Sequence, residues 1–479
     1  MKYFLTLIQL WVGFLSICAS YPKANIWIIP SVESPQVYRN YAQTSKVHLE
    51  MARGEVEHIQ LVFPSKVNEE YRFTFDRYLK GIQISARELK KMNGYYDALV
   101  PFKNQLKCTD TLTAVWITVQ CPSRVPVGKY HQTIKIEGSK HFTIQLDYNV
   151  HHTTIPLKSS IPITVGVENR CMTEGLNDKE ADKERQRWVD FVLSYRMTPV
   201  FGTQITPERW QYEHSFSPWA WNDKRSIRLL NDRRYSCYML PFFTLSENEL
   251  ASLLCNIQKK GKLKESLFYI WDEPAYMEDY EQIKRKVNII RKYASDARIL
   301  TTFFCGPRNG PRKGDLYAVF DYLKHHIHVA TISLAPCKGN EEEVQHIRYK
   351  VPEGIDWWSY VCWQPGGNEP NFLLQMKGIQ QRAVMWRTWK NGSQGFLYWN
   401  CNIYHKRNPF TYITDMPHGD GILIYPGDIL GCKGPIASAR LERWRDGAEE
   451  MELLRLVEKN YSKEKADTLL NIVYSSPLS

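Results

Sequence analysis

The sequence predicts an α/β protein in which a (β/α)8 barrel of the TIM type follows an N-terminal antiparallel β-sandwich domain. The chain has 479 residues, which is long enough for two or three domains. Short runs of alternating apolar and polar residues fill positions 24–155, whereas apolar strands alternate with helical stretches after position 160. A linker-like segment, TIPLKSSIP at residues 154–162, separates the two patterns.

The first pattern is typical of a sandwich. Its runs, such as EHIQLVF, TAVWITVQ and HFTIQLDYNV, are separated by Gly, Pro and Asn. Short strands at this spacing favour two packed antiparallel sheets. We therefore expect a β-sandwich domain at residues 24–155 and a barrel domain at residues 160–479.

The second pattern has eight apolar runs, and helix-like stretches such as 280–294 and 371–386 lie between most of them. An open doubly wound sheet is the alternative. Its first strand would lead into a glycine-rich phosphate loop, for which VGVENRCMTEG is a poor match. The predicted strands are ITVGV (163–167), PVFG (199–202), CYMLPFF (237–243), LFYIWDE (267–273), RILTTFF (298–304), HVATISLA (328–335), DWWSYVC (356–362) and GFLYWNCN (395–402).

The N-terminal segment MKYFLTLIQLWVGFLSICAS predicts a signal peptide over residues 1–20. One Lys precedes an apolar run that is short for a membrane span and ends in small residues. No other stretch of the sequence is long and apolar enough to cross a membrane. We therefore expect an exported protein, secreted or periplasmic, without a transmembrane segment.

Charge and cysteine content argue against several kinds of partner. The net charge is +11, yet basic clusters such as KKGKLK (259–264) are short and lie outside any nucleic-acid motif. We therefore expect no nucleic-acid partner, and the sequence indicates no particular oligomeric state. The 11 cysteines form no C-x-x-C or Cys/His cluster, so we expect neither a metal nor a cofactor. Cys108 and Cys121 are spaced to close a local loop, although buried free thiols are expected for several cysteines.

The motif FYIWDEPAY, residues 268–276, places two carboxyl groups at the end of the fourth predicted barrel strand. Active sites of such barrels lie at the C-terminal ends of the strands. Successive strand residues point in opposite directions, and Pro274 biases Glu273 toward an extended conformation. The two carboxyl groups should therefore be held in different directions. The plainer alternative is that Asp272 or Glu273 caps the helix that follows.

An acid pair on one strand end fits one glycosidase mechanism better than the others. Ordinary retaining glycosidases place an acid and a nucleophile about 5 Å apart on opposite sides of the bond. The seventh predicted strand, DWWSYVCWQP, has only Asp356, at the wrong end. A 2-acetamido sugar supplies its own nucleophile, the carbonyl oxygen, and forms an oxazoline. Asp272 would then orient the acetamido N–H, while Glu273 would act as general acid and base.

Five motifs together resemble glycoside hydrolase family 123: LFYIWDEP, DWWSYVCWQP, GFLYWNCN, HGDGILIYPG and ASARLERWRDGAEEMELL. The N-terminal ARGEVEHIQLVF is similar to the sandwich that precedes the barrel of this family, and the likeness runs from about residue 24 to 460. The resemblance implies β-N-acetylgalactosaminidase activity by the substrate-assisted retaining route. It also implies that Asp272 is the acetamido orienter and Glu273 the acid/base.

Other residues at the strand ends are candidates for substrate contacts. Tyr360 would hydrogen-bond the acetamido carbonyl oxygen, and Asn400 would bind sugar hydroxyls. Trp358, Trp363 and Trp399 would form a sugar platform or the acetamido pocket, although each alone also fits the core.

Two motifs near the C-terminus have mainly structural interpretations. Asp420 in HGDG would either reach a sugar hydroxyl or, as is commoner between glycines, stabilise a turn. The helix that follows begins near Ser438. Four of its residues are expected to form a structural set of salt bridges: Arg440, Glu442, Arg445 and Asp446.

The sequence therefore predicts an exported, retaining exo-β-N-acetylgalactosaminidase that removes terminal β-linked N-acetylgalactosamine from glycans or glycolipids. Galactosamine is favoured over glucosamine by the resemblance only. Two alternatives stay open: a non-catalytic secreted glycan-binding protein, and a glycosidase of other specificity that uses a protein nucleophile. Loss of Glu273 would leave the first unaffected, and the second would cleave β-galactosides that carry no acetamido group.

Overall fold

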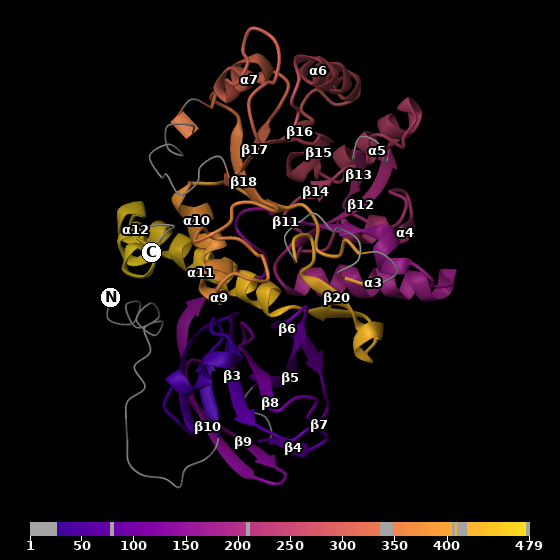
Figure 1. Ribbon diagram of the computed structural model, residues 1–479. Helices are drawn as coiled ribbons and strands as arrows, with labels where there is room; N and C mark the ends of the chain where they lie inside the picture. The colour runs from indigo at the N-terminus through magenta and orange to yellow at the C-terminus, as the bar shows by residue number, and fades with distance from the viewer. Residues whose placement is uncertain are drawn as a thin grey trace.

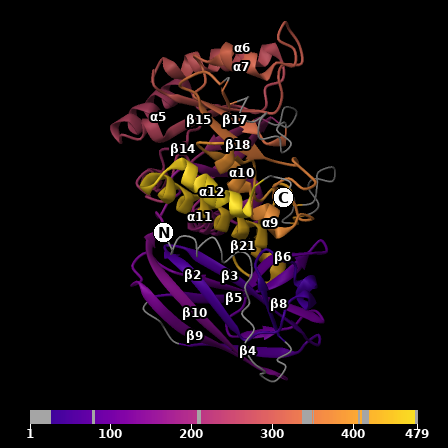
Figure 2. The ribbon, with the colours of Figure 1, turned by 90° about the vertical axis from the view of Figure 1, so that its left-hand side faces the viewer.

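The computed structural model describes residues 26–76, 81–206, 211–335, 348–349, 351–404, 408–409 and 419–475. Two parts pack against each other (Figures 1 and 2): the β-sandwich, indigo to purple at the lower end of both views, and a larger part built on a second sheet above it. The predicted signal peptide, residues 1–20, lies outside the described residues. Within the described ranges, no helix has the length and apolar character needed to cross a membrane.

Strands β1 to β10 form the sandwich. Pairing in its two sheets is antiparallel, except that β2 and β10 run parallel. Apolar side chains of both sheets, among them Leu61, Ile117 and Ile144, make one core between them. The first sheet is β1 (Trp27–Pro30), β3 (Val56–Pro64), β8 (Leu112–Gln120), β5 (Gln83–Met92), β6 (Tyr95–Pro101), and the second is β2 (Lys46–Arg53), β10 (His141–Thr154), β9 (Gly128–Glu137), β4 (Glu70–Phe75), β7 (Gln105–Lys107).

The second part is built on a nine-stranded sheet in the order β13-β12-β11-β19-β18-β17-β16-β15-β14. Its neighbours are parallel, except for the antiparallel pair β12 and β13. The two edges meet where the N–H of Phe216 donates to the carbonyl of Met239 at 2.6 Å. The strands are β11 (Ile163–Glu168), β12 (Thr198–Thr206), β13 (Gln211–Ser215), β14 (Tyr238–Met239), β15 (Ser266–Trp271), β16 (Arg298–Phe303), β17 (Val329–Ser333), β18 (Asp356–Val361) and β19 (Phe396–Tyr398).

All eight strands predicted for the barrel are present as parallel strands, but the fold is not a regular (β/α)8 barrel. β12 continues into a hairpin with β13, which the sequence analysis did not predict, and β14 has only two residues. Among the described residues, no ladder joins β13 to β14, and single contacts close the gap between them. The protein is therefore a mixed α/β fold with a nearly closed, barrel-like sheet. The domain limits 24–155 and 160–479 stay a prediction.

Helices surround the barrel-like sheet (Figures 1 and 2). α6 overlaps the helix expected at 280–294, whereas the helix expected at 371–386 begins only at Gly378. The Asn371 side chain donates to the carbonyls of Cys362 and Pro365 and so holds the preceding segment in an irregular path. The helices are α2 (Asn169–Thr173), α3 (Asp178–Ser194), α4 (Lys224–Leu229), α5 (Glu247–Lys259), α6 (Met277–Arg291), α7 (Leu316–Leu323), α9 (Gly378–Arg382), α10 (Val384–Lys390), α11 (Ala439–Asn460) and α12 (Lys463–Val473).

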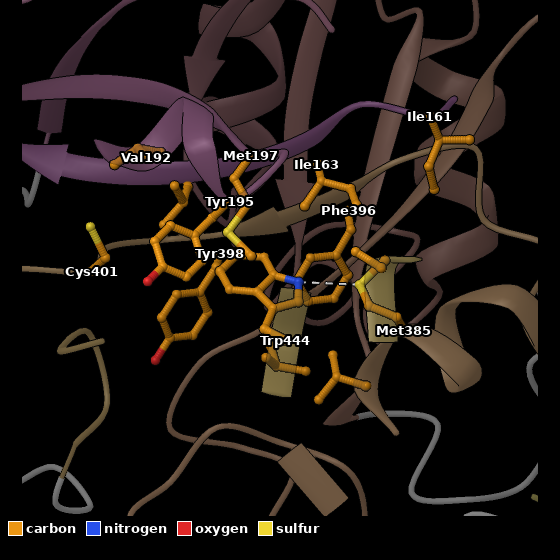
Figure 3. Close-up of a cluster of buried hydrophobic side chains, with 14 of the residues drawn as sticks. Ile161, Ile163, Val192, Tyr195, Met197, Met385, Phe396, Tyr398, Cys401 and Trp444 are labelled. Carbon is orange, nitrogen blue, oxygen red and sulfur yellow. Dashed lines mark hydrogen bonds between the residues drawn. The ribbon is translucent and has the colours of Figure 1, made fainter. Parts of the chain in front are cut away.

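Side chains of the parallel strands alternate between the barrel interior and the surrounding helices. On β18, Trp358 and Tyr360 belong to the interior cluster, while Trp357 and Val361 belong to the outer one. Figure 3 shows part of the outer cluster, in which Trp444 of α11 lies among side chains of β11, β19 and their neighbours. This alternation determines which residues reach the barrel mouth.

α11 is buried between the two parts of the protein, although many of its residues are charged. Arg440 donates to Asp97 of β6 at 2.9 Å and to the carbonyls of Phe372 and Gly419 at 2.7 Å. Gly419 has φ +87°, and a Cβ there would lie 2.6 Å from the Arg440 guanidinium, so this close approach requires glycine. Arg440 therefore connects the sandwich to the barrel.

A second group on α11 surrounds the buried His58 of β3. The ring Nε2 lies 3.2 Å from Glu442 and 3.3 Å from Asp446. Burial opposes a charged ring, but the two carboxylates outweigh it and raise the pKa of His58. Arg445 pairs with Glu442 in turn. The expected structural set of salt bridges is thus confirmed. The sandwich supplies Asp97 to Arg440 and His58 to Asp446, and Arg382 of α9 also pairs with Asp446.

The cysteines that the structure describes carry free thiols. Cys108 and Cys121, which were spaced to close a loop, are both buried and unbonded. They lie just after β7 and β8, in different sheets, so the core between the sheets accommodates them as small apolar groups.

The substitution Arg440→Met keeps most of the side-chain volume but leaves Asp97 buried without its guanidinium. Removing one partner of a buried pair costs about 3–5 kcal/mol, and we expect that loss in the free energy of unfolding. Urea unfolding followed by tryptophan fluorescence measures it. Lys324→Ala, which breaks an exposed pair with Asp321, is the control and should cost less than about 1 kcal/mol. Equal losses in the two variants would contradict this role for Arg440.

Candidate active site

The acid pair follows β15 at the end of the strand where the barrel opens. The pairing of β15 with β16 shifts between Tyr269 and Trp271, so that Trp271 pairs with Thr301. Such an irregularity redirects the side chains beyond it. As a result Asp272 lies beside the inward-facing Tyr269 and Thr302, and both hydroxyls donate to its Oδ1 at 2.7 Å.

Glu273 is held by the backbone and by a neighbouring strand. Its N–H donates to Oγ1 of Thr302 at 2.9 Å, and the hydroxyl of Tyr360 on β18 donates to its Oε1. Its φ is +45°, so the expected extended conformation before Pro274 is wrong. A residue other than glycine adopts this left-handed conformation at a cost of about 1–3 kcal/mol, and such strain gathers at functional sites.

The helix after the acid pair is capped by another residue. Oδ2 of Asp279 accepts hydrogen bonds from the N–H groups of Ala275 and Tyr276, each at 2.9 Å. α6 begins at Met277, so neither Asp272 nor Glu273 is its N-cap. The capping alternative is therefore wrong, and both carboxyl groups remain available for chemistry.

The two carboxyl groups differ in their electrostatics. Glu273 reaches the surface, yet the surrounding protein removes much of the water around its carboxyl group. This desolvation and the negative charge of Asp272 raise the pKa of Glu273 to about 7, against the lowering effects of the Tyr360 hydroxyl and the Arg308 charge. A carboxyl group with this pKa is partly protonated near neutral pH and is suited to general acid/base work.

A ring on β13 packs against Tyr269, the hydrogen-bond donor to Asp272. The His214 imidazole stacks on the Tyr269 ring at 4.3 Å and 11° between planes. Burial lowers the pKa of His214 to about 3, so the ring is neutral near neutral pH. The sequence analysis did not identify His214, Tyr269 or Thr302. Tyr269 and Thr302 could have been found from the alternation of inward and outward side chains along β15 and β16. His214 could not, because it lies on a hairpin that was not predicted.

The three tryptophans and the asparagine that were predicted to contact substrate differ in how far solvent reaches them. Trp358 is only 1% exposed in the barrel interior, and its contact with a sugar stays a prediction. Trp363 is 43% exposed just after β18 and presents its ring to solvent. Trp399 is half-buried and donates to Asp420 at 3.0 Å. Asn400 is buried and its Oδ1 accepts the N–H of Asn402.

The remaining predicted contact, Tyr360, lies at the site but binds Glu273 rather than an open position. Its proposed contact with an acetamido oxygen stays a prediction. Over the described ranges, no group of three or more His, Cys, Asp or Glu side chains is arranged to hold a metal ion.

Glycoside hydrolases commonly work with two carboxyl groups, one of which has a raised pKa, and the barrel mouth offers such a pair. The model of the glycoside hydrolase 123 catalytic domain matches residues 183–457. The chain therefore belongs to glycoside hydrolase family 123. No curated protein matches the sequence at a significant level.

Solved structures resemble this fold to different degrees. A family 123 glycoside hydrolase from Clostridium perfringens, studied for glycolipid glycan hydrolysis, matches with a TM-score of 0.65 and 14% identity, covering 93% of this chain and 91% of that chain. At this identity the likeness establishes the fold alone. A family 5 xyloglucanase from Bacteroides ovatus matches 84% of this chain and 98% of its own at 10% identity, but its TM-score of 0.28 is too low to support an argument.

The electrostatic arrangement predicts how Glu273 titrates. Its pKa should lie near 7, should fall in Asp272→Asn, which removes a negative neighbour, and should rise in Tyr360→Phe, which removes a donor to the carboxylate. Infrared difference titration of the carboxyl band, with Glu273→Gln as reference, measures all three values without any need for activity. A wild-type pKa at the ordinary value of about 4.3, unmoved by Asp272→Asn, would contradict the arrangement.

Proposed function

We propose that the protein is an exported, retaining exo-β-N-acetylgalactosaminidase that works by substrate-assisted catalysis through an oxazoline. The observation that carries the proposal is that the two adjacent acids have different surroundings: two hydroxyl groups donate hydrogen bonds to Asp272, while Glu273 has a pKa of about 7. One site thus offers an oriented carboxylate and a group that both donates and accepts a proton.

In the first step, protonated Glu273 donates its proton to the glycosidic oxygen as the bond from C1 to that oxygen breaks. The carbonyl oxygen of the 2-acetamido group forms a bond to C1 on the opposite face, and the positive charge spreads over the new ring. The carboxylate of Asp272 accepts a hydrogen bond from the acetamido N–H and stabilises this charge. Tyr269 and Thr302 hold Asp272 in the orientation that this contact requires.

In the second step, Glu273, now ionised, removes a proton from water as the water oxygen attacks C1 and the oxazoline opens. Two inversions at C1 give net retention of configuration. The hydrogen bond from Tyr360 stabilises the ionised form of Glu273 between the two steps.

The residues of β18, the seventh predicted barrel strand, support a nucleophile that belongs to the substrate rather than to the protein. Retaining enzymes with a protein nucleophile need a second carboxylate across the bond. The inward residue near the mouth end of β18 is Tyr360, whereas Asp356 lies at the other end of the strand and pairs there with Arg298. This strand therefore offers no carboxylate at the mouth, and the acetamido oxygen of the substrate acts as the nucleophile instead.

The sugar itself is proposed from the family resemblance, which favours galactosamine. Terminal β-linked N-acetylgalactosamine on glycans or glycolipids is the proposed substrate. The N-terminal segment, residues 1–20, is proposed as the signal for export.

A glycosidase with a protein nucleophile is a second candidate, because two further buried carboxyl groups lie near strand ends of the barrel. Glu168 ends β11, and Asp420 accepts a hydrogen bond from Trp399 just after β19. The two candidates differ in their response to a thiazoline analogue of N-acetylgalactosamine, which mimics the oxazoline. Strong competitive inhibition and no turnover of plain β-galactosides favour the substrate-assisted route. Turnover of plain β-galactosides without thiazoline inhibition favours the other.

Glu273→Gln should lower kcat/KM for a methylumbelliferyl β-N-acetylgalactosaminide by about 100- to 10,000-fold, because the leaving oxygen loses its proton donor. The loss should shrink for dinitrophenyl glycosides, whose leaving group needs no proton. Asp272→Asn should lower kcat/KM by about 100- to 1,000-fold for both, since the charge that it stabilises develops whatever the leaving group. Steady-state kinetics on the two substrates measures these values.

The control for these variants is Asp356→Asn, which removes an acid from the opposite end of the same barrel. It should retain wild-type kcat/KM. A folded Glu273→Gln protein with the activity of the wild type would remove Glu273 from the mechanism. A loss in Glu273→Gln that does not depend on the leaving group would contradict its role as general acid.

A further inference from the structure

Two buried carboxyl groups at the barrel mouth each have one oxygen without a hydrogen-bond partner in the described chain: Oε2 of Glu168 and Oδ2 of Asp420. Glu168 is 4% exposed and Asp420 is 3% exposed. A buried polar atom without a partner costs about 1–3 kcal/mol, so an orphaned carboxylate oxygen needs a physical explanation. Neither residue is required by the chemistry proposed for Asp272 and Glu273.

Glu168 ends β11 and belongs to its inward-facing set, because Ile163, Val165 and Val167 pack outward against the helices. Its Oε1 accepts the N–H of Arg170 at 3.2 Å. Its own backbone N–H and carbonyl are both bonded to the Asn402 side chain, so the residue is fixed in place.

Oε2 of Glu168 lies beside Gly202, and the Tyr212 ring of β13 lies 3.6 Å from where a Cβ of that glycine would be. The neighbouring inward residue on β12 is Gly202, where a Cβ would lie 4.0 Å from this oxygen. Burial raises the pKa of Glu168 to about 7. The carboxyl group is therefore held firmly through its backbone and Oε1, while its second oxygen is left for another partner.

Asp420 lies in the segment between β19 and β20 (Ile424–Pro426) and is held beside the end of β19 by side-chain hydrogen bonds. Its Oδ1 accepts the Tyr398 hydroxyl at 3.2 Å and the Trp399 indole N–H at 3.0 Å. Arg440 binds the carbonyls of Gly419 and Ile422 on either side of it. These contacts use only one carboxylate oxygen, and burial raises the pKa of Asp420 to about 6.

The strand order places β11 and β19, beside which the two orphaned oxygens lie, across the barrel from the acid pair. In the sheet order, β11 and β19 are neighbours, and β18, β17 and β16 separate them from β15. In a sheet that curves into a barrel, β15 therefore faces β11 and β19. Cys362, just after β18, belongs to the interior cluster between the two sides, and burial, followed by the charges of Asp420 and Glu273, raises the pKa of its thiol.

A pyranose has a matching polarity. Its anomeric carbon and 2-acetamido group lie at one end of the ring, and the C4 and C6 hydroxyls lie at the other, with the C3 hydroxyl between. If the reacting end meets Asp272 and Glu273, the hydroxyl end points toward β11 and β19. Each hydroxyl brings the O–H donor that an orphaned carboxylate oxygen lacks.

We propose that Glu168 and Asp420 form the hydroxyl-recognition side of the sugar site, each accepting a hydrogen bond from a ring hydroxyl of the terminal sugar through its unpartnered oxygen. The orientation of the sugar in this proposal rests on the proposed function of the acid pair. A site built from buried acceptors discriminates strongly against sugars that lack the matching hydroxyl or carry it on the other face, because the acceptor is then left unpaired. The two residues are thus specificity determinants rather than catalytic groups.

The test compares wild type, Glu168→Gln and Asp420→Asn on nitrophenyl β-N-acetylgalactosaminide and its 3-, 4- and 6-deoxy analogues. In each variant the amide oxygen keeps the internal bonds, and an amide nitrogen, which donates hydrogen bonds and cannot accept one, replaces the orphaned oxygen. Wild type should prefer the parent sugar to at least two deoxy analogues by about 10- to 100-fold in kcat/KM. In each variant the ratio of kcat/KM between the parent sugar and one deoxy analogue should fall about tenfold. The ratios for the other two analogues should stay as in wild type.

Glu452→Gln is the matched control, because Glu452 is also buried but both of its oxygens are hydrogen-bonded to Ser159 and Ser160, far from the mouth. It should leave every deoxy ratio unchanged. Deoxy ratios in Glu168→Gln and Asp420→Asn that equal those of wild type would overturn the proposal, as would ratios that change equally in the control.

A crystal structure of the wild type with the N-acetylgalactosamine thiazoline gives a readout that needs no turnover. The proposal expects a ring hydroxyl within about 3.2 Å of each orphaned oxygen. Water at both oxygens, with the hydroxyls bound elsewhere, would overturn it even if the acetamido group contacts Asp272.

Failure of the proposed function has a different signature. If the enzyme cleaves only sugars without an acetamido group, the deoxy series is run on the corresponding plain β-galactosides and the carboxyl proposal is judged on those ratios. A covalent adduct of a 2-deoxy-2-fluoro galactoside on Glu168 or Asp420 would make that residue a nucleophile and would overturn both proposals.

Discussion

The contact of Arg440 with Asp97 is the interaction on which the arrangement of the two parts depends. The guanidinium is completely buried, yet it bonds a carboxylate of the sandwich and three carbonyl groups of the barrel. A buried charge of this kind is tolerated only when every donor finds a partner, so the two parts must meet in one orientation. Two of those carbonyls flank Asp420, so the same residue that joins the parts also fixes one side of the barrel mouth.

The opposite side of the mouth is organised by local irregularity rather than by long-range charge. The register shift in β15 brings Asp272 beside Thr302, and the left-handed conformation of Glu273 directs the next carboxyl group toward Tyr360. Two residues that are adjacent in sequence thereby acquire different partners. The difference in their partners is what gives them different chemical tasks, and mutual repulsion helps to keep Glu273 protonated near neutral pH.

Much of the fold could be predicted from the sequence, because the strands are short apolar runs that turn-forming residues separate. The eight parallel strands, the sandwich and the position of the acid pair at a strand end all follow from periodicity and from the Trp-Asp-Glu-Pro motif. The salt bridges of the last long helix were also predictable, since charged residues there repeat at helical spacing, although their partners in the sandwich were not.

What the sequence did not reveal depends on register and on contacts between distant residues. A β-bulge leaves no distinctive residue pattern, so neither the shift in β15 nor the left-handed Glu273 could be derived. The burial of Trp358, which points into the barrel interior two residues before Tyr360, likewise depends on the closed sheet rather than on its own strand. Glu168 looked like an ordinary strand end, and only its unpartnered oxygen in the folded protein distinguishes it.

The most direct test of the account is the effect of fluorinating the acetamido group of the substrate. Mono-, di- and trifluoroacetamido analogues of nitrophenyl β-N-acetylgalactosaminide carry progressively less nucleophilic carbonyl oxygens, while the rest of the sugar is unchanged. If that oxygen attacks C1 with Asp272 and Glu273 in their proposed tasks, kcat should fall steeply and regularly with each added fluorine. A kcat that stays flat across the series would mean that the carbonyl oxygen takes no part in the reaction and would contradict the account.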